Sequence, residues 1–173
     1  MTPTPPRVRI IQLPPDALAA LGGGDAAAAE AAAPVALSDY LTGPECRKIW
    51  AYRAQQVLRT PEDLAWVTGV LWDEDAGAAV GRAGFHGAPD AAGMVEIGYA
   101  VDPARRRRGY ARAALTTLLA RAVTEPEVRT LRATISPDNE ASLGLIRQFD
   151  FVENGEQWDE EDGLEIIYEI PVG

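Results

Sequence analysis

Apolar and polar residues alternate along several stretches of the chain, and each of these stretches predicts a β-strand. The clearest runs from Val95 to Val101, where every second residue is apolar and the residues between are glutamate, glycine and alanine. Alternation, together with runs of β-branched and aromatic residues, predicts six more strands. Their ranges are Arg7 to Leu13, Ala65 to Trp72, Ala78 to His86, Val128 to Ile135, Phe151 to Gln157 and Leu164 to Ile170.

Apolar residues at helical spacing predict helices between these strands. Residues Gly43 to Arg59 form the strongest case, an amphipathic helix that ends before Pro61. Further helices are predicted at Asp16 to Leu21, Tyr110 to Val123 and Asn139 to Gln148. The alanine-rich stretch Asp25 to Ala33 is predicted to be a helix capped by Asp25, with a flexible segment as the alternative, and Pro34 to Thr42 is predicted to be a loop.

Length and composition indicate one globular domain over residues 1–173. A chain of 173 residues is long enough to bury its own core, and no internal repeat divides it. No apolar run approaches the roughly 20 residues of a membrane span, and the first ten residues contain no apolar signal core. We therefore expect a cytoplasmic protein without a membrane partner.

The net charge and the single cysteine and histidine limit which partners and sites this protein can have. The net charge of −10 argues against nucleic-acid binding, which needs a basic surface. One cysteine, Cys46, excludes an internal disulfide framework and a cysteine-rich metal site, and we predict that it is a core residue. The one histidine, His86, is either a structural residue or part of an acceptor pocket.

An arginine-rich segment follows the strand that ends at Val101. Asp102 and Pro103 stop the strand, Arg105 to Arg108 lead into Gly109, and a helix begins at Tyr110. The first turn of a helix has N–H groups without intrahelical partners, and the helix dipole adds positive charge there. This arrangement predicts a phosphate site, whereas the alternative is a solvated basic loop.

Three motifs together resemble the GNAT superfamily of N-acetyltransferases. Arg106 to Ala111 resembles the Gln/Arg-x-x-Gly-x-Gly/Ala loop that holds the pyrophosphate of acetyl-coenzyme A (acetyl-CoA), Glu96 to Tyr99 lies upstream, and Ser136 to Ser142 resembles the family's Asn-x-x-Ser helix start. The resemblance spans residues 93–151 and is closest to the branch that acetylates ribosomal-protein N-termini. It implies an α/β (α+β) GNAT fold, with a mixed central sheet of six to seven strands that splay between the fourth and fifth strands and are flanked by helices.

The resemblance also implies acetyl-CoA as co-substrate and no metal. The implied cofactor-binding residues lie on the strand before the loop, in the loop, and at the start of the following helix-forming motif. They are Tyr99, Ala100, Val101, Arg106, Arg107, Arg108, Gly109, Tyr110, Ala111, Asn139 and Ser142.

Direct acetyl transfer to an amine requires that the amine lose a proton, and Glu96 is our candidate for the general base, directly or through water. An exposed strand carboxylate is the alternative interpretation. Many family members place a proton-donating tyrosine where this chain has Ile146, so the general acid is not identified. We expect a peptide N-terminus, a lysine or a small-molecule amine as acceptor, and leave open a homodimer and a non-catalytic acyl-CoA-binding module.

Overall fold

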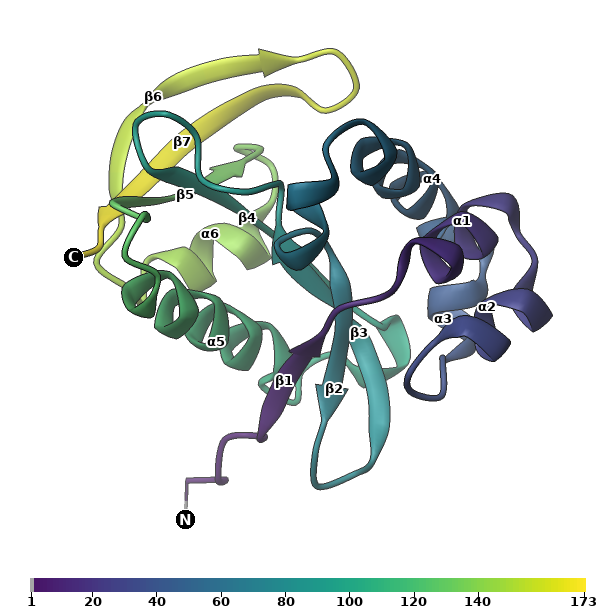
Figure 1. Cartoon of the computed structure of the whole chain (residues 1–173). Coiled ribbons are helices and arrows are strands. Elements are labelled where there is room, and N and C mark those ends of the chain that lie inside the picture. Colours follow the sequence, from purple (N-terminus) through teal and green to yellow (C-terminus); the bar gives the residue numbers. More distant parts are fainter. Residues whose placement is uncertain (1) are drawn as a thin grey trace. The chain divides into compact units, whose positions relative to one another are not determined.

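The computed structural model describes residues 2–173 and divides them into two compact units. The first contains the chain up to Ala88 together with Gly98–Thr117, and the second contains Pro89–Ile97 and Leu118–Gly173. The seven described strands are hydrogen-bonded in the order β1-β2-β3-β4-β5-β7-β6 (Figure 1). Strand β4 (Met94–Val101) and helix α5 (Tyr110–Thr124) each have residues in both units.

The first unit contains three whole strands and most of the helices. Strands β1 and β2 are antiparallel, as are β2 and β3, and a bulge interrupts the second pairing between Leu71 and Trp72. Besides its parts of β4 and α5, the unit contains β1 (Val8–Ile11), α1 (Pro15–Gly23), α2 (Ala26–Ala32), α3 (Asp39–Thr42), α4 (Pro44–Arg59), the 3-10 helix η1 (Pro61–Ala65), β2 (Gly69–Asp73), β3 (Ala78–Phe85) and the 3-10 helix η2 (Pro103–Arg105).

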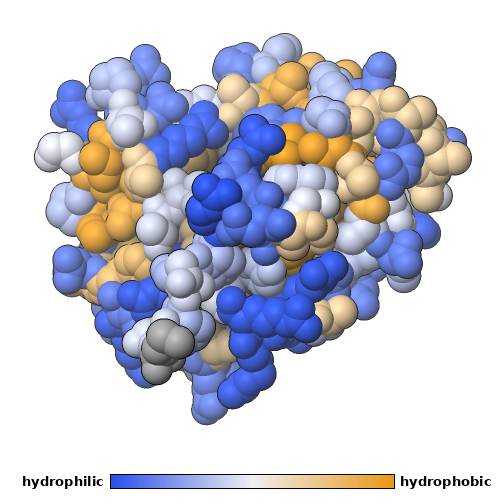
Figure 2. Space-filling view, turned by 90° about the horizontal axis from the view of Figure 1, so that it is seen from below, coloured by the Kyte–Doolittle hydropathy of each residue, from blue (hydrophilic) through white to orange (hydrophobic). Residues whose placement is uncertain are grey.

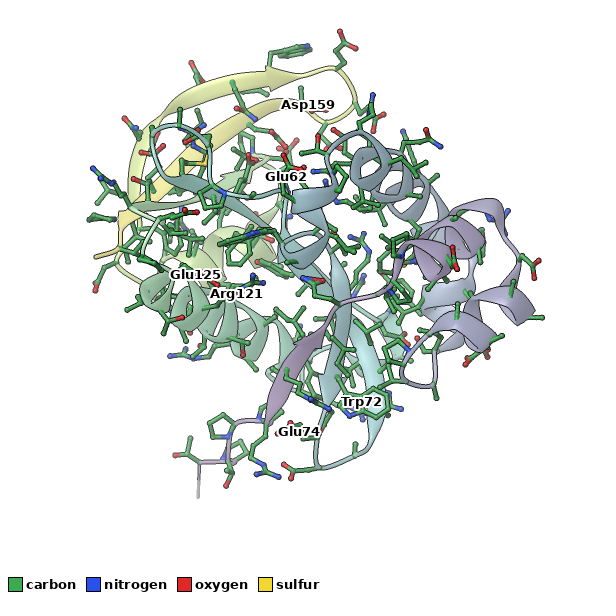
Figure 3. All side chains as sticks on the ribbon, in the orientation of Figure 1. Glu62, Trp72, Glu74, Arg121, Glu125 and Asp159 are labelled. Atoms are coloured by element: carbon green, nitrogen blue, oxygen red, sulfur yellow. The ribbon has the colours of Figure 1, made fainter. Side chains whose placement is uncertain are left out.

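The second unit contains the parallel strand pair. Strand β4 runs parallel to β5 (Thr130–Ile135), with Glu96 opposite Arg132. Strand β7 (Gly163–Pro171) is antiparallel both to β5 and to β6 (Val152–Asp159), and helix α6 spans Glu140–Ile146. The turn between β6 and β7 is held by Asp159, whose Oδ1 accepts from two backbone N–H groups (Figure 3).

Most of the predicted elements are confirmed with shifts at their ends, but the strand predicted at Ala65 to Trp72 is wrong in its first half. Its first residue, Ala65, ends η1, residues 66–68 form a turn and irregular backbone, and the strand begins at Gly69. Pro61 suits the first turn of a helix, and Trp66 N donates to Asp63 O at 2.8 Å. The apolar pattern of the predicted strand therefore began within the turn that connects η1 to β2.

The loop predicted at Pro34 to Thr42 is also partly wrong, because its end forms the short helix α3. The Ser38 side chain accepts from Leu41 N at 3.3 Å, which caps the helix. Helix α2 is confirmed together with its predicted cap, since Asp25 Oδ1 accepts from Ala28 N at 3.0 Å. The flexible alternative for that stretch is excluded.

Helix–helix packing supplies much of the core of the first unit. Gly22 of α1 allows a close approach to α4, because a Cβ at this position would lie 2.6 Å from the Cα of Ala51. Cys46 is fully buried in the same cluster, as predicted, and the indole N–H of buried Trp50 donates to Leu41 O at 2.9 Å. These helices therefore form a closely packed layer.

Strand β5 and the part of β4 in the second unit have one apolar, buried face and one polar face. Leu131, Ala133 and Ile135 are buried, whereas Arg132 and Thr134 between them are half-buried polar residues. Val95 and Ile97 of β4 are likewise buried on either side of Glu96. The period-two pattern thus predicted correctly which side chains enter the core.

Charged side chains occupy much of the surface. Figure 2 shows hydrophilic residues over most of one face, with separate hydrophobic patches. Arg121 of α5 and Glu125, which follows the last residue of this helix, form an ion pair at 3.3 Å (Figure 3). None of the helices among residues 2–173 is long and apolar enough to cross a membrane.

Candidate active site

The loop between β4 and α5 has a backbone conformation suited to anions. Arg107 has a φ of 60° and Gly109 a φ of 84°, both in the left-handed region that non-glycine residues rarely adopt. Left-handed Gly109 is followed by the right-handed helical residue Tyr110, and such a pair turns successive N–H groups toward one side, which favours an anion. Ala113 N donates the first bond of α5 to Gly109 O at 3.0 Å, so the N–H groups before it point out of the helix end.

Charged side chains surround this turn. Arg106, Arg107 and Arg108 are exposed, and they concentrate positive charge on a protein with a net charge of −10. Asp102 holds the other end of the loop, because its N–H donates to Val80 O and its side chain accepts from Ala104 N, both at 2.9 Å. The loop therefore offers both backbone donors and exposed cationic side chains to a polyphosphate.

Tyr110 anchors the first residue of α5 to β2. Its hydroxyl donates to Asp73 Oδ2 at 2.5 Å, and both side chains are buried. The other oxygen of Asp73 accepts from the N–H groups of Asp75 and Ala76 at 2.8 and 3.0 Å. The hydrogen bond from Tyr110 is the main cause that lowers the pKa of Asp73, and the same bond raises the pKa of Tyr110. The side chain of Tyr110 thus faces inward, which leaves its backbone to take part in binding.

Gly109 faces the segment that precedes β1. A Cβ at Gly109 would lie 3.4 Å from Cδ of Pro6, an ordinary contact distance. The next residue, Arg7, forms a salt bridge with Asp75 at 2.8 Å, and its carbonyl accepts from Glu74 N at 2.9 Å. The start of the chain is therefore fastened beside the loop, on the turn that also holds Asp73.

The second half of β4 belongs to the first unit and contains three predicted cofactor residues, Tyr99, Ala100 and Val101, all half-buried. A Cβ at Gly98 would lie 3.1 Å from Nε2 of His86, so the glycine gives room to the imidazole. The absence of a side chain at Gly98 therefore has a physical role in the packing of His86.

Glu96 lies on the polar face of the second unit. Its carboxylate Oε1 accepts from the Thr134 hydroxyl at 2.6 Å. A charge-assisted bond this short is strong and restricts the rotamer of the carboxylate. Glu96 is half-buried, so it is neither the freely solvated strand carboxylate of the alternative interpretation nor a core residue.

Arg132 lies opposite Glu96 in the parallel register but pairs with a residue of β7. Its Nε and Nη2 donate to Glu169 Oε1 at 2.9 and 2.6 Å. The other oxygen of Glu169 accepts from Asn154 Nδ2 at 2.9 Å. Three strands thus share one line of polar contacts on this face.

Asn139 caps α6, as predicted. Its Oδ1 accepts from the backbone N–H of Ser142 at 3.1 Å, so both predicted residues lie at the start of this helix. Ile146, at the position where many family members have tyrosine, is 2% exposed and belongs to the core. The helix therefore supplies no proton donor at that position.

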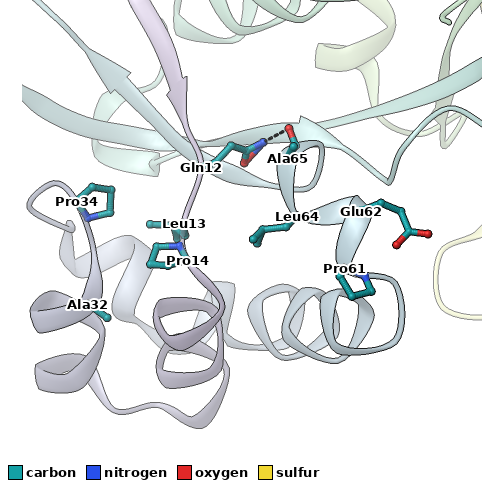
Figure 4. A pocket seen from close by; sticks show the side chains of 9 residues that line it. All are labelled: Gln12, Leu13, Pro14, Ala32, Pro34, Pro61, Glu62, Leu64 and Ala65. Carbon is teal, nitrogen blue, oxygen red and sulfur yellow. Dashed lines mark hydrogen bonds between the residues drawn. The ribbon is translucent and has the colours of Figure 1, made fainter.

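The first unit also contains an open cavity of about 720 Å³ (Figure 4). Its walls are mainly apolar, with Glu62 as the charged residue among those that line it. Gln12 closes one side through a bond from Nε2 to Ala65 O at 3.0 Å (Figure 4). Such a cavity suits an apolar group rather than a phosphate.

The structure thus places the predicted site residues in two sets. Tyr99 to Val101 and Arg106 to Ala111 lie in the first unit, and Glu96, Asn139 and Ser142 lie in the second. Among residues 2–173, no group of three or more His, Cys, Asp or Glu side chains is arranged to hold a metal. Sequence reasoning missed Asp73, Thr134, Arg132 and Glu169 as supporting residues, although the alternation along β5 already indicated a polar face.

The chain belongs to the GNAT acetyltransferase family: the model of the acetyltransferase (GNAT) domain matches residues 21–152, which include parts of both units. A Bacillus subtilis protein, described as the uncharacterized N-acetyltransferase YjdG, is 33% identical over 85 residues. That alignment covers 49% of this chain and 51% of the relative, so the chain spans about half the length of the curated relative it matches.

Solved structures show the same fold at low identity. A chimera of the spermidine N-acetyltransferase SpeG from Vibrio cholerae and hSSAT superposes with a TM-score of 0.66 at 14% identity, covering 95% of both chains. RimL, a ribosomal L7/L12 alpha-N-protein acetyltransferase in complex with coenzyme A, has a TM-score of 0.65 at 16% identity, covering 98% of this chain and 97% of its own. These neighbours support the predicted GNAT fold.

Proposed function

We propose that this protein is an N-acetyltransferase that moves the acetyl group of acetyl-CoA directly to a primary amine. The observation that carries the proposal is the turn before α5, where two left-handed residues, a helix start and three exposed arginines occur together in a chain of this family. Because the family model spans both units, we treat residues 1–173 as one acetyltransferase domain.

The residues of the turn fit a diphosphate group. Backbone N–H groups from Gly109 to Ala111 would bind its oxygens, because the helix dipole and the orphan donors both favour an anion. Arg106, Arg107 and Arg108 would neutralise its charge, while Tyr99 to Val101 of the same unit would bind the pantetheine arm. Bound acetyl-CoA supplies a thioester, whose carbon–sulfur bond breaks as the carbon–nitrogen bond to the acceptor forms.

Glu96 would take the proton that the acceptor amine must lose, directly or through a water molecule. Its half-buried carboxylate is held by Thr134, which keeps one oxygen in a defined position. The buried Ile146 cannot return a proton to the leaving thiolate, so we assign that proton to solvent. A thiol pKa near 8.5 makes this assignment reasonable, since the thiolate is a fair leaving group.

The charge of the protein favours a cationic acceptor. At a net charge of −10, a protonated amine is attracted, whereas anionic acceptors are repelled. SpeG and RimL are named for spermidine and for a ribosomal protein, respectively. We therefore infer that the acceptor is a polyamine, a lysine or a peptide N-terminus, and we place the reaction in the cytoplasm, where the single unpaired Cys46 would remain reduced.

A second candidate is a non-catalytic acyl-CoA-binding module. The observation that favours it is Ile146, because the structure shows a packed core side chain where many relatives have a proton donor. The two candidates share the diphosphate site and differ in Glu96. Loss of acetyl transfer in Glu96→Gln, with acetyl-CoA binding retained, would exclude the module.

Calorimetric titration with acetyl-CoA tests the proposal first. In Gly109→Asp, a carboxylate would stand about 5 Å from the diphosphate, and the repulsion of about 1–3 kcal/mol lowers affinity roughly tenfold to a hundredfold. Gly155→Asp is the matched control, because Gly155 also has a positive φ of 89° and open space around it. We expect the control to bind like the wild type. Equal binding by both variants, or none by the wild type, would refute the assigned site.

A further inference from the structure

Glu96 has a cationic neighbour that the reaction must keep away from it. Arg132 lies opposite Glu96 in the register of β4 and β5, and adjacent strands are about 4.8 Å apart. Both side chains project from the polar face, because their neighbours Val95, Ile97, Leu131 and Ala133 are buried on the other one. An arginine this close would ordinarily pair with the glutamate beside it.

Arg132 is instead held by Glu169. The guanidinium donates twice to one carboxylate oxygen of Glu169, at 2.9 and 2.6 Å, and both side chains are partly shielded from solvent. Asn154 fixes the other oxygen of Glu169 at 2.9 Å, so the carboxylate cannot easily rotate away. The consequence is a guanidinium directed across β5 toward β7 rather than toward β4.

Thr134 holds Glu96 from the same strand that carries Arg132. Its hydroxyl donates to Glu96 Oε1 at 2.6 Å, which favours a fixed rotamer without adding a positive charge. Besides Glu96, the charged side chains on this face of β5 and β7 are Arg132, Glu169 and Glu165, because Glu165 lies four residues before Glu169 on the same strand. In the first unit, the titratable His86 lies against Gly98, two residues further along β4.

We propose that Glu169 is a positioning residue for the acetyl transfer: it captures Arg132 and thereby keeps this guanidinium away from the Glu96 carboxylate. This inference rests on the proposed role of Glu96. If Arg132 paired with Glu96, the positive charge would lower the pKa of the carboxylate and weaken it as a base. The same charge would also repel a cationic acceptor.

The positioning role of Glu169 is tested by substituting Glu169 and then restoring activity with a second substitution at Arg132. Glu169→Gln removes the charge that holds Arg132 while keeping the shape of the side chain. We expect kcat to fall about tenfold and the acidic limb of its pH profile to move about one unit lower, because an opposite charge beside a carboxylate has this effect. The KM for acetyl-CoA should stay unchanged. A second substitution, Arg132→Met, should return kcat and the acidic limb close to their wild-type values.

The control is Glu165→Gln, on the same strand and also in a side-chain hydrogen bond, from Gln157 at 2.9 Å. It should leave both kcat and the pH profile unchanged. A double variant no more active than Glu169→Gln, or a Glu169→Gln enzyme with an unshifted pH profile, would overturn the inference.

Direct titration of the Glu96 carboxylate tests the positioning role of Glu169 without measuring enzyme activity. The pKa of Glu96, followed by carbon NMR of its labelled carboxylate, should fall in Glu169→Gln and return in the double variant. Glu96→Gln separates this inference from the proposed function. If Glu96→Gln is fully active, the role of Glu96 itself is wrong; if it is inactive while Glu169→Gln behaves as wild type, only the positioning role is wrong.

Discussion

Replacement of Tyr110 by phenylalanine removes one hydroxyl from the start of α5 and leaves its ring in place. The lost bond runs to Asp73 Oδ2 at 2.5 Å, and the two residues are only 7% and 5% exposed, so water cannot easily substitute. Loss of a buried hydrogen bond to a charged group costs about 2 kcal/mol of stability. For a chain of this length the melting temperature should fall by about 4–8 °C.

Urea unfolding followed by tryptophan fluorescence measures this loss, and pH provides a second test. The folded-state pKa of Asp73 is lowered, so its stabilising contribution is present above the ordinary aspartate pKa of about 3.9 and is lost as the pH falls through the lower folded value. The pKa of Tyr110 is raised, so its contribution is present below about 10 and is lost as the pH rises through the folded value. The difference between wild type and Tyr110→Phe should therefore be constant near neutrality and shrink at both extremes.

Tyr52→Phe serves as the control. Tyr52 is 59% exposed on α4, and its ring contact with Arg53 survives the change, so its stability should shift by less than about 0.5 kcal/mol. If Tyr110→Phe is as stable as Tyr52→Phe at pH 7, the buried bond does not anchor α5. A difference that persists unchanged at pH 2 would contradict the role assigned to Asp73.

Two further substitutions test local packing and capping. Gly22→Ala should destabilise the protein by about 1–3 kcal/mol, because its Cβ would meet Ala51 at 2.6 Å. The control Gly23→Ala has open space around its Cβ and should be neutral or stabilising by up to about 1 kcal/mol. Equal melting temperatures for the two variants would contradict the close approach of α1 to α4. Asn139→Ala removes the acceptor for Ser142 N and should cost about 1 kcal/mol in urea unfolding, while Asn139→Asp keeps a capping oxygen, so equal losses would show that the cap contributes little.

Local pattern predicted most of the elements of this fold. The alternation around Val95 and Ile97 and the helical spacing of Gly43 to Arg59 are visible in the sequence because burial repeats with the period of each element. The incorrect predictions lie in short segments, where few residues contribute to the apolar pattern and local turn or capping residues decide the backbone conformation. The 3-10 helix that begins at Pro61 extends to Ala65, the first residue of the predicted strand, and Ser38 caps a helix of four residues.

The sequence by itself determined the turn and helix start at which we propose a diphosphate site, because Gly109 and the helix start after it are contiguous in the chain. Its motifs also predicted the Asn139 cap, whose partner Ser142 is three residues away, and proposed Glu96 as a site residue. Only the tertiary structure decided the partners of residues that are far apart in the chain. Tyr110 meets Asp73 from 37 residues away, and Arg132 meets Glu169 across another 37. Such pairs depend on strand order and register, which set the distances between side chains and which no local period encodes.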